Sequence, residues 1–245
     1  MALGVLRDKM AFMNEELIKA YYEKNPEGIA ATENTPEVLE LHRILIDNVI
    51  KISPDKLLDA GCGKGYTGES VSKYCQSYYG FDISSAAIEI AKERLPHGRF
   101  QAGSLRELPY ESDYFDCVIC SEVIEHIPEY KTAIRELSRV TKKSGYILIT
   151  LPNKLNPDMM WRHFRKGRYT SQIYDNPPHY KELIKEFNGN SLDILEFYSF
   201  YYYPVKGNSM PYFIRKPLMR VMEFNSKITG RPKGLYLFFK LQKRG

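Results

Sequence analysis

The chain has 245 residues, of which 43% are hydrophobic and 27% charged, and its formal net charge is +5. This composition is ordinary for a globular protein, so it excludes a largely disordered chain, and the length suits one α/β domain with an added piece. The longest uncharged run, residues 144–153, is too short to span a bilayer, and four cysteines do not predict a disulfide framework, so we expect a reduced, cytoplasmic protein.

Residues 1–54 form the first predicted unit, an N-terminal helical segment. Thr35-Pro36-Glu37 is typical of a helix start, with Thr as the N-cap, Pro at the first helical position and Glu in the first turn. Apolar residues then recur at steps of three and four from Val38 to Ile52, which is the pattern of an amphipathic helix.

Residues 55–152 form the second predicted unit, in which short apolar runs alternate with helical segments. We expect strands at 56–60, 77–83, 99–103, 115–121 and 146–151, and helices at 67–75, 85–95 and 129–141. Ser144-Gly145 predicts a turn into the fifth strand. The alternation predicts an α/β fold with a mostly parallel sheet and helices on both faces.

Residues 153–190 interrupt this regularity and are predicted to be a substrate-binding insertion. The stretch is rich in proline, asparagine, aromatic and basic residues, and among them we expect Trp161, His163 and Tyr169 to contact the substrate. A segment this long between strands usually carries function. A short helix over 180–187 is expected near its end.

Residues 191–245 are predicted to supply two C-terminal strands, at 192–200 and 234–241, with a basic cap insertion between them. Residues 206–245 have a net charge of +9, whereas the rest of the chain has a net charge of −4. Three interpretations stay open: peripheral contact with an anionic membrane, contact with an anionic substrate, and an ordinary solvated face. Nucleic acid is a less favoured partner, because no separate RNA-binding module is apparent.

The most informative stretch is the glycine-rich run that follows the first predicted strand. The strand carries Asp59 and continues into a G-x-G-x-G bend from Gly61 to Gly65, where the backbone can approach a ligand closely. Such a bend lies at the carboxyl end of the sheet, where α/β folds bind ligands. Asp59 favours a cationic ligand. Asp82 ends the second strand about 20 residues later, where an acid can accept hydrogen bonds from both ribose hydroxyls.

A dinucleotide site is a competing interpretation, because residues 63–68 also match G-x-G-x-x-G. That register would start two residues late, and Asp59 would repel a pyrophosphate. For Asp82 and Ser84, a second interpretation is that one of them caps the next helix.

Two further motifs support a family assignment: Leu108-Pro109-Tyr110, and FDCVICSEVIEHI over residues 115–127. Together with LLDAGCGKG and GFDIS, they make the sequence resemble class I S-adenosylmethionine-dependent methyltransferases of the small-molecule type, similar to ubiquinone-biosynthesis O-methyltransferases. The resemblance covers about residues 55–155. It implies a Rossmann-like sheet of seven strands with an antiparallel last strand, and it makes residues 55–152 a core that binds S-adenosylmethionine and releases S-adenosylhomocysteine.

The resemblance also assigns cofactor-binding residues. The methionine end of the cofactor is assigned to Asp59, Gly61, Cys62, Gly63 and Gly65, and the ribose and adenine to Asp82 and Ile83. Ser104 and Leu105 belong to a turn that packs on the adenine, and Cys120 and Ser121 supply backbone near the sulfonium. One position departs from the family pattern. The family often has Asp, which accepts from the adenine amino group, where this chain has the shorter, uncharged Ser104.

Histidines are the candidates for a catalytic base, and we expect His126 or His179 to fill this role, with His163 as a further candidate. His126 follows the fourth strand, and His179 lies in a segment that resembles one in the ubiquinone O-methyltransferases. We expect no metal site. Cys117 and Cys120 are three residues apart on a strand, so their side chains point to opposite faces and do not chelate one ion.

These observations predict a methyltransferase that moves a methyl group by in-line displacement to an oxygen, or to a nitrogen or carbon, of a small molecule. We expect that molecule to be apolar or acidic, with lipid-linked compounds included. Two alternatives stay open: an RNA or tRNA methyltransferase, and a non-catalytic S-adenosylmethionine-binding protein that regulates a partner.

Overall fold

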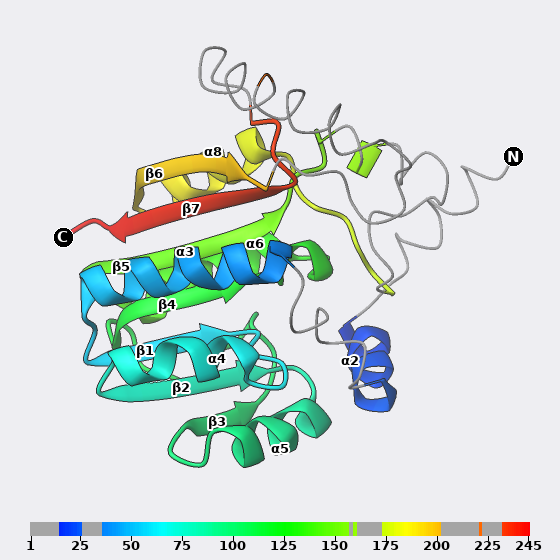
Figure 1. Cartoon of the computed structure of the whole chain (residues 1–245), viewed down its shortest axis with the longest axis vertical. Helices are drawn as coiled ribbons and strands as arrows, with labels where there is room; N and C mark the ends of the chain where they lie inside the picture. The colour runs from blue at the N-terminus through cyan, green and yellow to red at the C-terminus, as the bar shows by residue number, and fades with distance from the viewer. Residues whose placement is uncertain (1–14, 26–35, 157–158, 161–172, 202–220, 222–231) are drawn as a thin grey trace, which may run out of the picture.

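One seven-stranded sheet organises the molecule (Figure 1). The structure is a computed structural model that describes residues 15–25, 36–156, 159–160, 173–201, 221 and 232–245. In chain order the strands are β1 (Lys56–Ala60), β2 (Ser77–Asp82), β3 (Arg99–Ala102), β4 (Phe115–Ser121), β5 (Thr141–Pro152), β6 (Leu192–Phe200) and β7 (Tyr236–Lys243). Their order in the sheet is β3-β2-β1-β4-β5-β7-β6. The first five strands are parallel, and β7 is antiparallel to both of its neighbours, which confirms the predicted topology.

Helices cover both faces of the sheet (Figure 1). On one face lie α3 (Pro36–Ile52), α4 (Tyr66–Val71) with the 3₁₀ turn Ser72–Tyr74, and α5 (Ser85–Arg94). On the other face lie α6 (Tyr130–Val140) and α8 (Tyr180–Gly189). In the part of the chain that is described, no helix combines the length and the apolar character that crossing a bilayer requires.

The two faces of the sheet have separate apolar cores, and β4 contributes to both. Cys120 packs in the core under α6 and α8, whereas Cys117 packs in the core under α3. Both side chains are completely buried. This arrangement confirms that the two cysteines point to opposite faces of the strand.

The fifth strand differs from its prediction, because β5 begins at Thr141 rather than at residue 146. The predicted turn at Ser144-Gly145 is an irregularity inside the strand: Ser144 has φ 61°, and the register between β4 and β5 shifts at this point. A Cβ atom on Gly145 would lie 3.0 Å from the carbonyl oxygen of Asp116. The two residues are therefore typical of a bulge between paired strands, and such bulges look like turns in a sequence.

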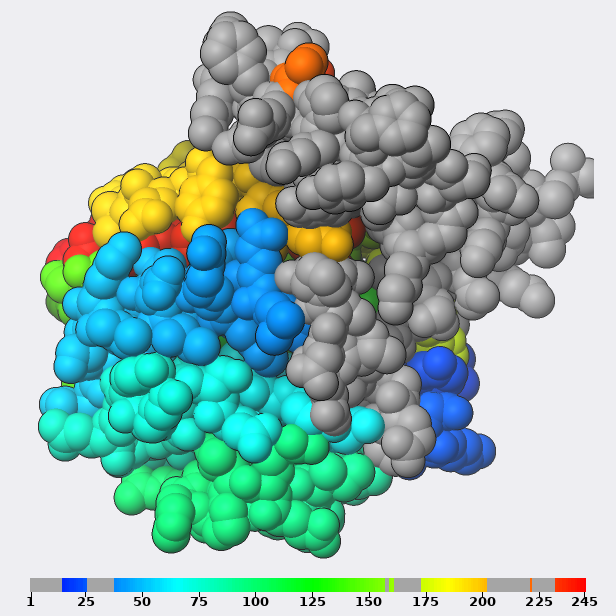
Figure 2. All heavy atoms as spheres, viewed as in Figure 1, coloured from blue at the N-terminus to red at the C-terminus, as the bar shows by residue number. Residues whose placement is uncertain are grey.

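The carboxyl edge of the sheet carries the candidate site. The chain leaves β1, β2, β3 and β4 at this edge, because these strands are parallel. Beyond it lies α2 (Glu15–Lys24), which Figure 1 shows set across the end of the sheet rather than along one face. Figure 2 shows the same helix at the rim of the molecule, next to the segment that begins at residue 173.

Candidate active site

The glycine-rich bend after β1 is held by the neighbouring strand. The backbone N–H groups of Gly61 and Cys62 both donate to the carbonyl oxygen of Phe81, at 2.7 and 3.1 Å. Gly61, Gly63 and Gly65 all have positive φ, at 89°, 50° and 82°. At Gly61 a Cβ atom would lie 2.2 Å from a methyl carbon of Val123, so glycine is required there by conformation and by space.

Asp82 orients this bend from the end of β2. Its Oδ2 accepts from the N–H of Gly63 at 2.8 Å, and its Oδ1 accepts from the N–H of Ser84 at 2.9 Å. Burial raises the pKa of Asp82, although the backbone N–H groups oppose that shift. Each oxygen keeps a second lone pair, so the carboxylate can still accept from a sugar diol. The capping role belongs to Ser84, whose Oγ accepts from the N–H of Ala87 at the start of α5.

Asp59 lies at the end of β1 and is only 1% exposed. Its Oδ2 accepts a hydrogen bond from the Tyr78 hydroxyl at 2.8 Å. Burial raises the pKa of Asp59 to about 7, in spite of that hydrogen bond. Among the described residues no lysine or arginine pairs with this carboxyl group. A buried acid without a cationic partner fits the positively charged end of a ligand.

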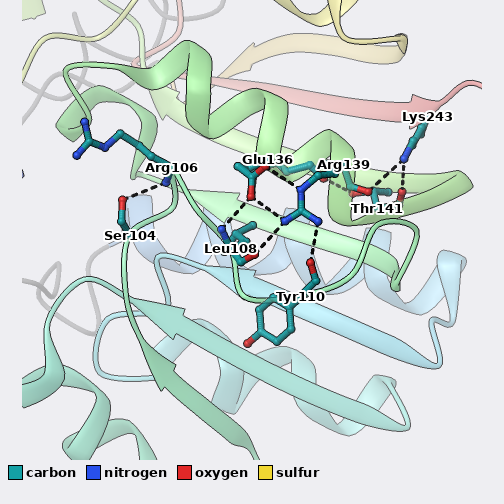
Figure 3. A network of polar contacts seen from close by, with 9 residues as sticks. Ser104, Arg106, Leu108, Tyr110, Glu136, Arg139, Thr141 and Lys243 are labelled. Carbon is teal, nitrogen blue, oxygen red and sulfur yellow. Dashed lines mark hydrogen bonds and ion pairs between the residues drawn. The ribbon is translucent and has the colours of Figure 1, made fainter.

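The loop after β3 brings Ser104 next to Asp82, because the N–H of Gly103 donates to the Asp82 carbonyl oxygen at 2.8 Å. The next residue, Leu105, is 6% exposed and belongs to the core under α6. The Ser104 Oγ accepts from the N–H of Arg106 at 3.1 Å (Figure 3).

Arg139 of α6 fixes the rest of that loop (Figure 3). Its guanidinium donates to the carbonyl oxygens of Tyr110 and Leu108, at 2.7 and 2.9 Å. Glu136 pairs with Arg139 at 2.7 Å and accepts from the N–H of Leu108 at 2.9 Å. The predicted Leu-Pro-Tyr motif is therefore clamped by two side chains of one helix.

Helix α2 packs against this side of the site, a position that no sequence pattern predicts. Glu23 accepts from the N–H groups of Ser85 and Ala86, at 2.8 and 3.1 Å, at the start of α5. At the other end of the helix, Glu15 contacts the β3 loop. The partners lie 62 or more positions away in sequence, so no local pattern reports these contacts.

Tyr22 of α2 lies between the cofactor side and the β4 side of the site. It is 8% exposed and packs with Ile18 and Tyr174. Burial raises the pKa of its hydroxyl, and the carboxyl groups of Glu125 and Asp82 raise it further. The phenol therefore stays protonated at physiological pH.

The loop after β4 carries an acidic cluster, which we define as Glu122, Glu125 and Asp175. Glu122 has φ 58°, a backbone conformation that non-glycine residues rarely adopt. Burial raises its pKa to about 8, and burial together with Glu122 raises that of Glu125. Oε1 of Glu122 and Oε2 of Glu125 are buried and have no hydrogen-bond partner among the residues that the structure describes. The sequence shows these glutamates only as letters of a motif and does not predict that they are buried together.

The two predicted residues that end β4 are structural neighbours of this cluster. Cys120 is completely buried, and Ser121 shares a hydrogen bond of 2.8 Å with Thr150 on β5. The N–H of Glu122 donates to the Thr150 carbonyl oxygen at 3.0 Å. Thr150 therefore fixes the point where the chain turns from the strand into the acidic cluster.

His126 has the form that a general base needs. Its Nδ1 lies 2.7 Å from the carbonyl oxygen of Tyr174. Because a carbonyl only accepts, Nδ1 carries the hydrogen and Nε2 keeps its lone pair. Nε2 lies 3.7 Å from Oε1 of Glu125. Burial lowers the pKa of His126, so the neutral ring is favoured.

His179 has a structural explanation that His126 lacks. It is the N-cap of α8, its Nδ1 accepts from the N–H of Lys181 at 3.1 Å, and its ring stacks on Tyr180 at 4.7 Å. Its catalytic role stays a prediction. Trp161, His163 and Tyr169 lie outside the described residues.

The sequence predicts no metal site and a basic C-terminal segment. In the described part of the chain, no group of three His, Cys, Asp or Glu side chains is placed to hold a metal ion. Three cations of the basic C-terminal segment pair with acids of the body: Lys240 with Glu196, Lys243 with Asp113, and Arg244 with Asp193. These three fit the interpretation of an ordinary solvated face.

Comparisons with known proteins agree with this geometry. Residues 58–149 match the family model described as a methyltransferase domain. The chain is 32% identical over 99 residues to an uncharacterized methyltransferase of Bacillus subtilis, YcgJ, and the match covers 38% of this chain and 39% of YcgJ. It is 30% identical over 157 residues to the ubiquinone biosynthesis O-methyltransferase of Nitrosomonas europaea, covering 61% of this chain and 66% of that protein. The chain thus spans about two fifths of one relative and two thirds of the other.

Solved structures show the same fold. The crystal structure of B. subtilis YcgJ has a TM-score of 0.60 at 20% identity, covering 83% of this chain and 100% of that one. A Haloferax volcanii methyltransferase, solved in complex with the Trm112 methyltransferase activator, has a TM-score of 0.65 at 14% identity, covering 93% and 98%. With its glycine bend, its two strand-end carboxylates and its matched domain, the chain belongs to the class I S-adenosylmethionine-dependent methyltransferases.

Proposed function

We propose that this protein transfers a methyl group from S-adenosylmethionine to an oxygen or nitrogen atom of a small organic molecule. When bound, the cofactor supplies a methyl group on a positively charged sulfur, with a neutral thioether as the leaving group. The protein's task is then to hold and align the reactants and to exclude water. The observation that carries the proposal is the position of a neutral, oriented His126 at the same sheet edge as Asp59 and Asp82.

The residues present fit this cofactor. Asp59 offers a buried carboxyl group that lacks a cationic partner among the described residues, and it would hold the ammonium of the methionine end. Asp82 keeps lone pairs toward a ribose diol while its other contacts fix the glycine bend. At Gly61 the missing Cβ keeps the backbone clear beside Val123.

His126 would take the proton of the acceptor. Its Nδ1–H is tied to the Tyr174 carbonyl, so only the Nε2 lone pair is available to a hydroxyl or amine. The hydrogen bond from the N–H of Asn176 to the Glu125 carbonyl, at 2.9 Å, joins the segment around Tyr174 to the β4 loop and keeps the imidazole aligned.

The acidic cluster narrows the acceptor class. Burial favours the protonated forms of Glu122 and Glu125, so a carboxylate on the acceptor would gain no ionic attraction from this cluster, whereas a positive charge would favour their ionised forms. We therefore propose an acceptor whose reacting end is neutral or cationic, which revises the acidic alternative. The proposal of an apolar or lipid-linked body rests on the basic, aromatic stretches 161–169 and 212–227, of which the structure describes only residue 221.

A labelled-methyl assay tests the proposal. Purified protein is incubated with methyl-labelled S-adenosylmethionine and host lysate that is divided into small-molecule, lipid, protein and RNA fractions. We expect label in the small-molecule or lipid fraction and its loss in His126→Gln. Label that is released only by ribonuclease would instead show an RNA methyltransferase. No label in any fraction, with S-adenosylhomocysteine still bound, would show a non-catalytic cofactor-binding protein.

A further inference from the structure

Glu15, in the first turn of α2, places a carboxylate at the end of β3. One of its oxygens accepts from the Ser104 hydroxyl, and the other pairs with the guanidinium of Arg106. Arg106 also pairs with Glu129 at 2.5 Å, so its side chain is held on both sides. The Glu15 side chain is 24% exposed, which leaves part of the carboxylate accessible. This residue lies outside the segment that matches the methyltransferase family model.

The Ser104 hydroxyl is already used both as a hydrogen-bond donor and as an acceptor. Its single hydrogen is donated to Glu15, and its oxygen already accepts from the N–H of Arg106 at 3.1 Å. A carboxylate, by contrast, has about four acceptor positions, and two contacts leave some of them open. The acceptor that this end of the sheet presents is therefore the Glu15 carboxylate.

Glu15 and Asp82 lie near the ends of two adjacent strands, β3 and β2. Ser104 follows Gly103, whose N–H is bonded to the Asp82 carbonyl oxygen, so both carboxylates lie at the carboxyl edge of adjacent strands. Ile83, the residue after Asp82, packs against α2 with Ile18 and Tyr22. A flat base bound to a sugar at Asp82 would lie on this apolar surface, with its edge toward Glu15.

We propose that Glu15 accepts a hydrogen bond from the 6-amino group of the adenine and selects amino over oxo purines. A carboxylate only accepts hydrogen bonds, so it favours an N–H donor and disfavours a carbonyl oxygen at the same place. Helix α2 is then part of the cofactor site. This inference rests on the proposed function, because it assumes that the adenosine group binds at Asp82.

Titration calorimetry with two ligands tests the inference. The ligands are S-adenosylhomocysteine and S-inosylhomocysteine, which differ in having an amino or an oxo group at position 6. We expect the wild-type protein to bind the amino compound about tenfold or more tightly. Glu15→Ala should weaken binding of that compound about tenfold and remove most of the preference. Glu16→Ala is the matched control, since it removes the same charge from a neighbouring exposed position of the same helix.

A rescue variant separates recognition from helix docking. In the double variant Glu15→Ala with Ser104→Asp, a carboxylate returns to the same place from the β3 loop, so both the affinity and the preference for the amino compound should return. If Glu15→Ala weakens both ligands equally, or if the double variant recovers neither property, Glu15 only docks the helix and the inference is overturned. Failure of the wild-type protein to bind S-adenosylhomocysteine would overturn the proposed function, whereas wild-type binding with unchanged Glu15→Ala affinity would overturn this inference alone.

Discussion

The two halves of the site differ in the hydrogen bonds that their buried carboxyl groups receive. At the ends of β1 and β2, Asp59 and Asp82 receive hydrogen bonds from a tyrosine and from backbone N–H groups. At the end of β4, Glu122 and Glu125 each keep a buried oxygen that no described residue hydrogen-bonds. In the proposed function the first half binds the cofactor and is organised by hydrogen bonds within the fold, whereas the second half meets the acceptor and retains groups that can gain a partner.

This contrast separates carboxyl groups that hydrogen bonds hold in place from carboxyl groups that can gain a partner. A carboxylate bonded to backbone N–H groups is locked in place by the fold. Burial raises the pKa of Glu122 to about 8 in spite of a hydrogen bond from Thr150, so this acid binds a proton that it can release when a partner arrives. Substitutions in the cofactor half should therefore change binding, and substitutions in the acceptor half should change turnover and the pH dependence of stability.

The largest expected effect is in the acceptor half, at His126. His126→Gln removes the Nε2 lone pair that takes the acceptor proton, so methyl transfer should slow by about 10²–10⁴-fold. The affinity for S-adenosylhomocysteine should stay unchanged. Initial rates with labelled cofactor measure the first quantity, and calorimetry measures the second. The exposed His97 provides the control variant His97→Gln, which should match the wild type in both.

Asp82→Ala tests the cofactor half. Loss of this carboxylate removes the ribose acceptor and leaves the N–H groups of Gly63 and Ser84 unpaired, so the affinity for S-adenosylhomocysteine should fall about 100-fold. Asp47→Ala, at an exposed position on α3, is the comparison variant. Equal affinities in both variants would contradict the role given to β2 in binding.

Asp59 should make cofactor binding depend on pH. Its pKa of about 7 means that the carboxyl group is mostly protonated at pH 6 and mostly ionised at pH 8. If the ionised form holds the ligand ammonium, the affinity for S-adenosylhomocysteine should rise about tenfold over that interval. Calorimetry at both pH values measures this rise. Asp59→Asn should bind more weakly and show a flat profile, and a wild-type profile that is equally flat would exclude Asp59 from the binding step.

The smallest expected effect is a gain in stability from Glu122→Gln. An acid whose folded-state pKa lies near 8 binds more protons in the folded than in the unfolded state between about pH 4 and 8. The wild-type protein therefore loses stability as pH rises through this window, and the amide does not. At pH 8 the free energy of unfolding of the variant should be about 1 kcal/mol higher than that of the wild type, and its melting temperature should be a few degrees higher. Glu111→Gln, at an exposed loop position, should melt like the wild type.

Local sequence patterns were sufficient for much of the fold. The predicted bounds of the first and fourth strands, 56–60 and 115–121, agree with β1 and β4, because both are apolar runs that end at polar or turn-forming residues. The glycine bend after the first strand and the position of Asp82 at the end of the second strand were likewise expected from the motif, whereas the positive φ of Gly61 and the bond from Gly63 to Asp82 were not. In each case the residue and its partner belong to neighbouring elements of one βαβ unit.

Contacts between distant segments were not predictable. The link from Glu15 to Ser104 spans 89 positions, and the bond from His126 to the Tyr174 carbonyl spans 48. Neither leaves a periodic pattern, because each depends on how a loop or helix end docks after the sheet has formed. The raised pKa of Glu122 could not be predicted either, because burial is a property of the assembled fold and not of the local sequence.

The two cysteines of β4, which face opposite sides of the sheet, report on local unfolding of each side. Burial raises the pKa of the Cys117 and Cys120 thiols, so neither reacts as a thiolate while its layer stays closed. Because one thiol faces the α3 layer and the other the α6 and α8 layer, their alkylation rates measure separately how often each side of the sheet becomes accessible to reagent. A ligand that tightens only the carboxyl edge would leave both rates unchanged, whereas one that stabilises the whole fold would slow them together.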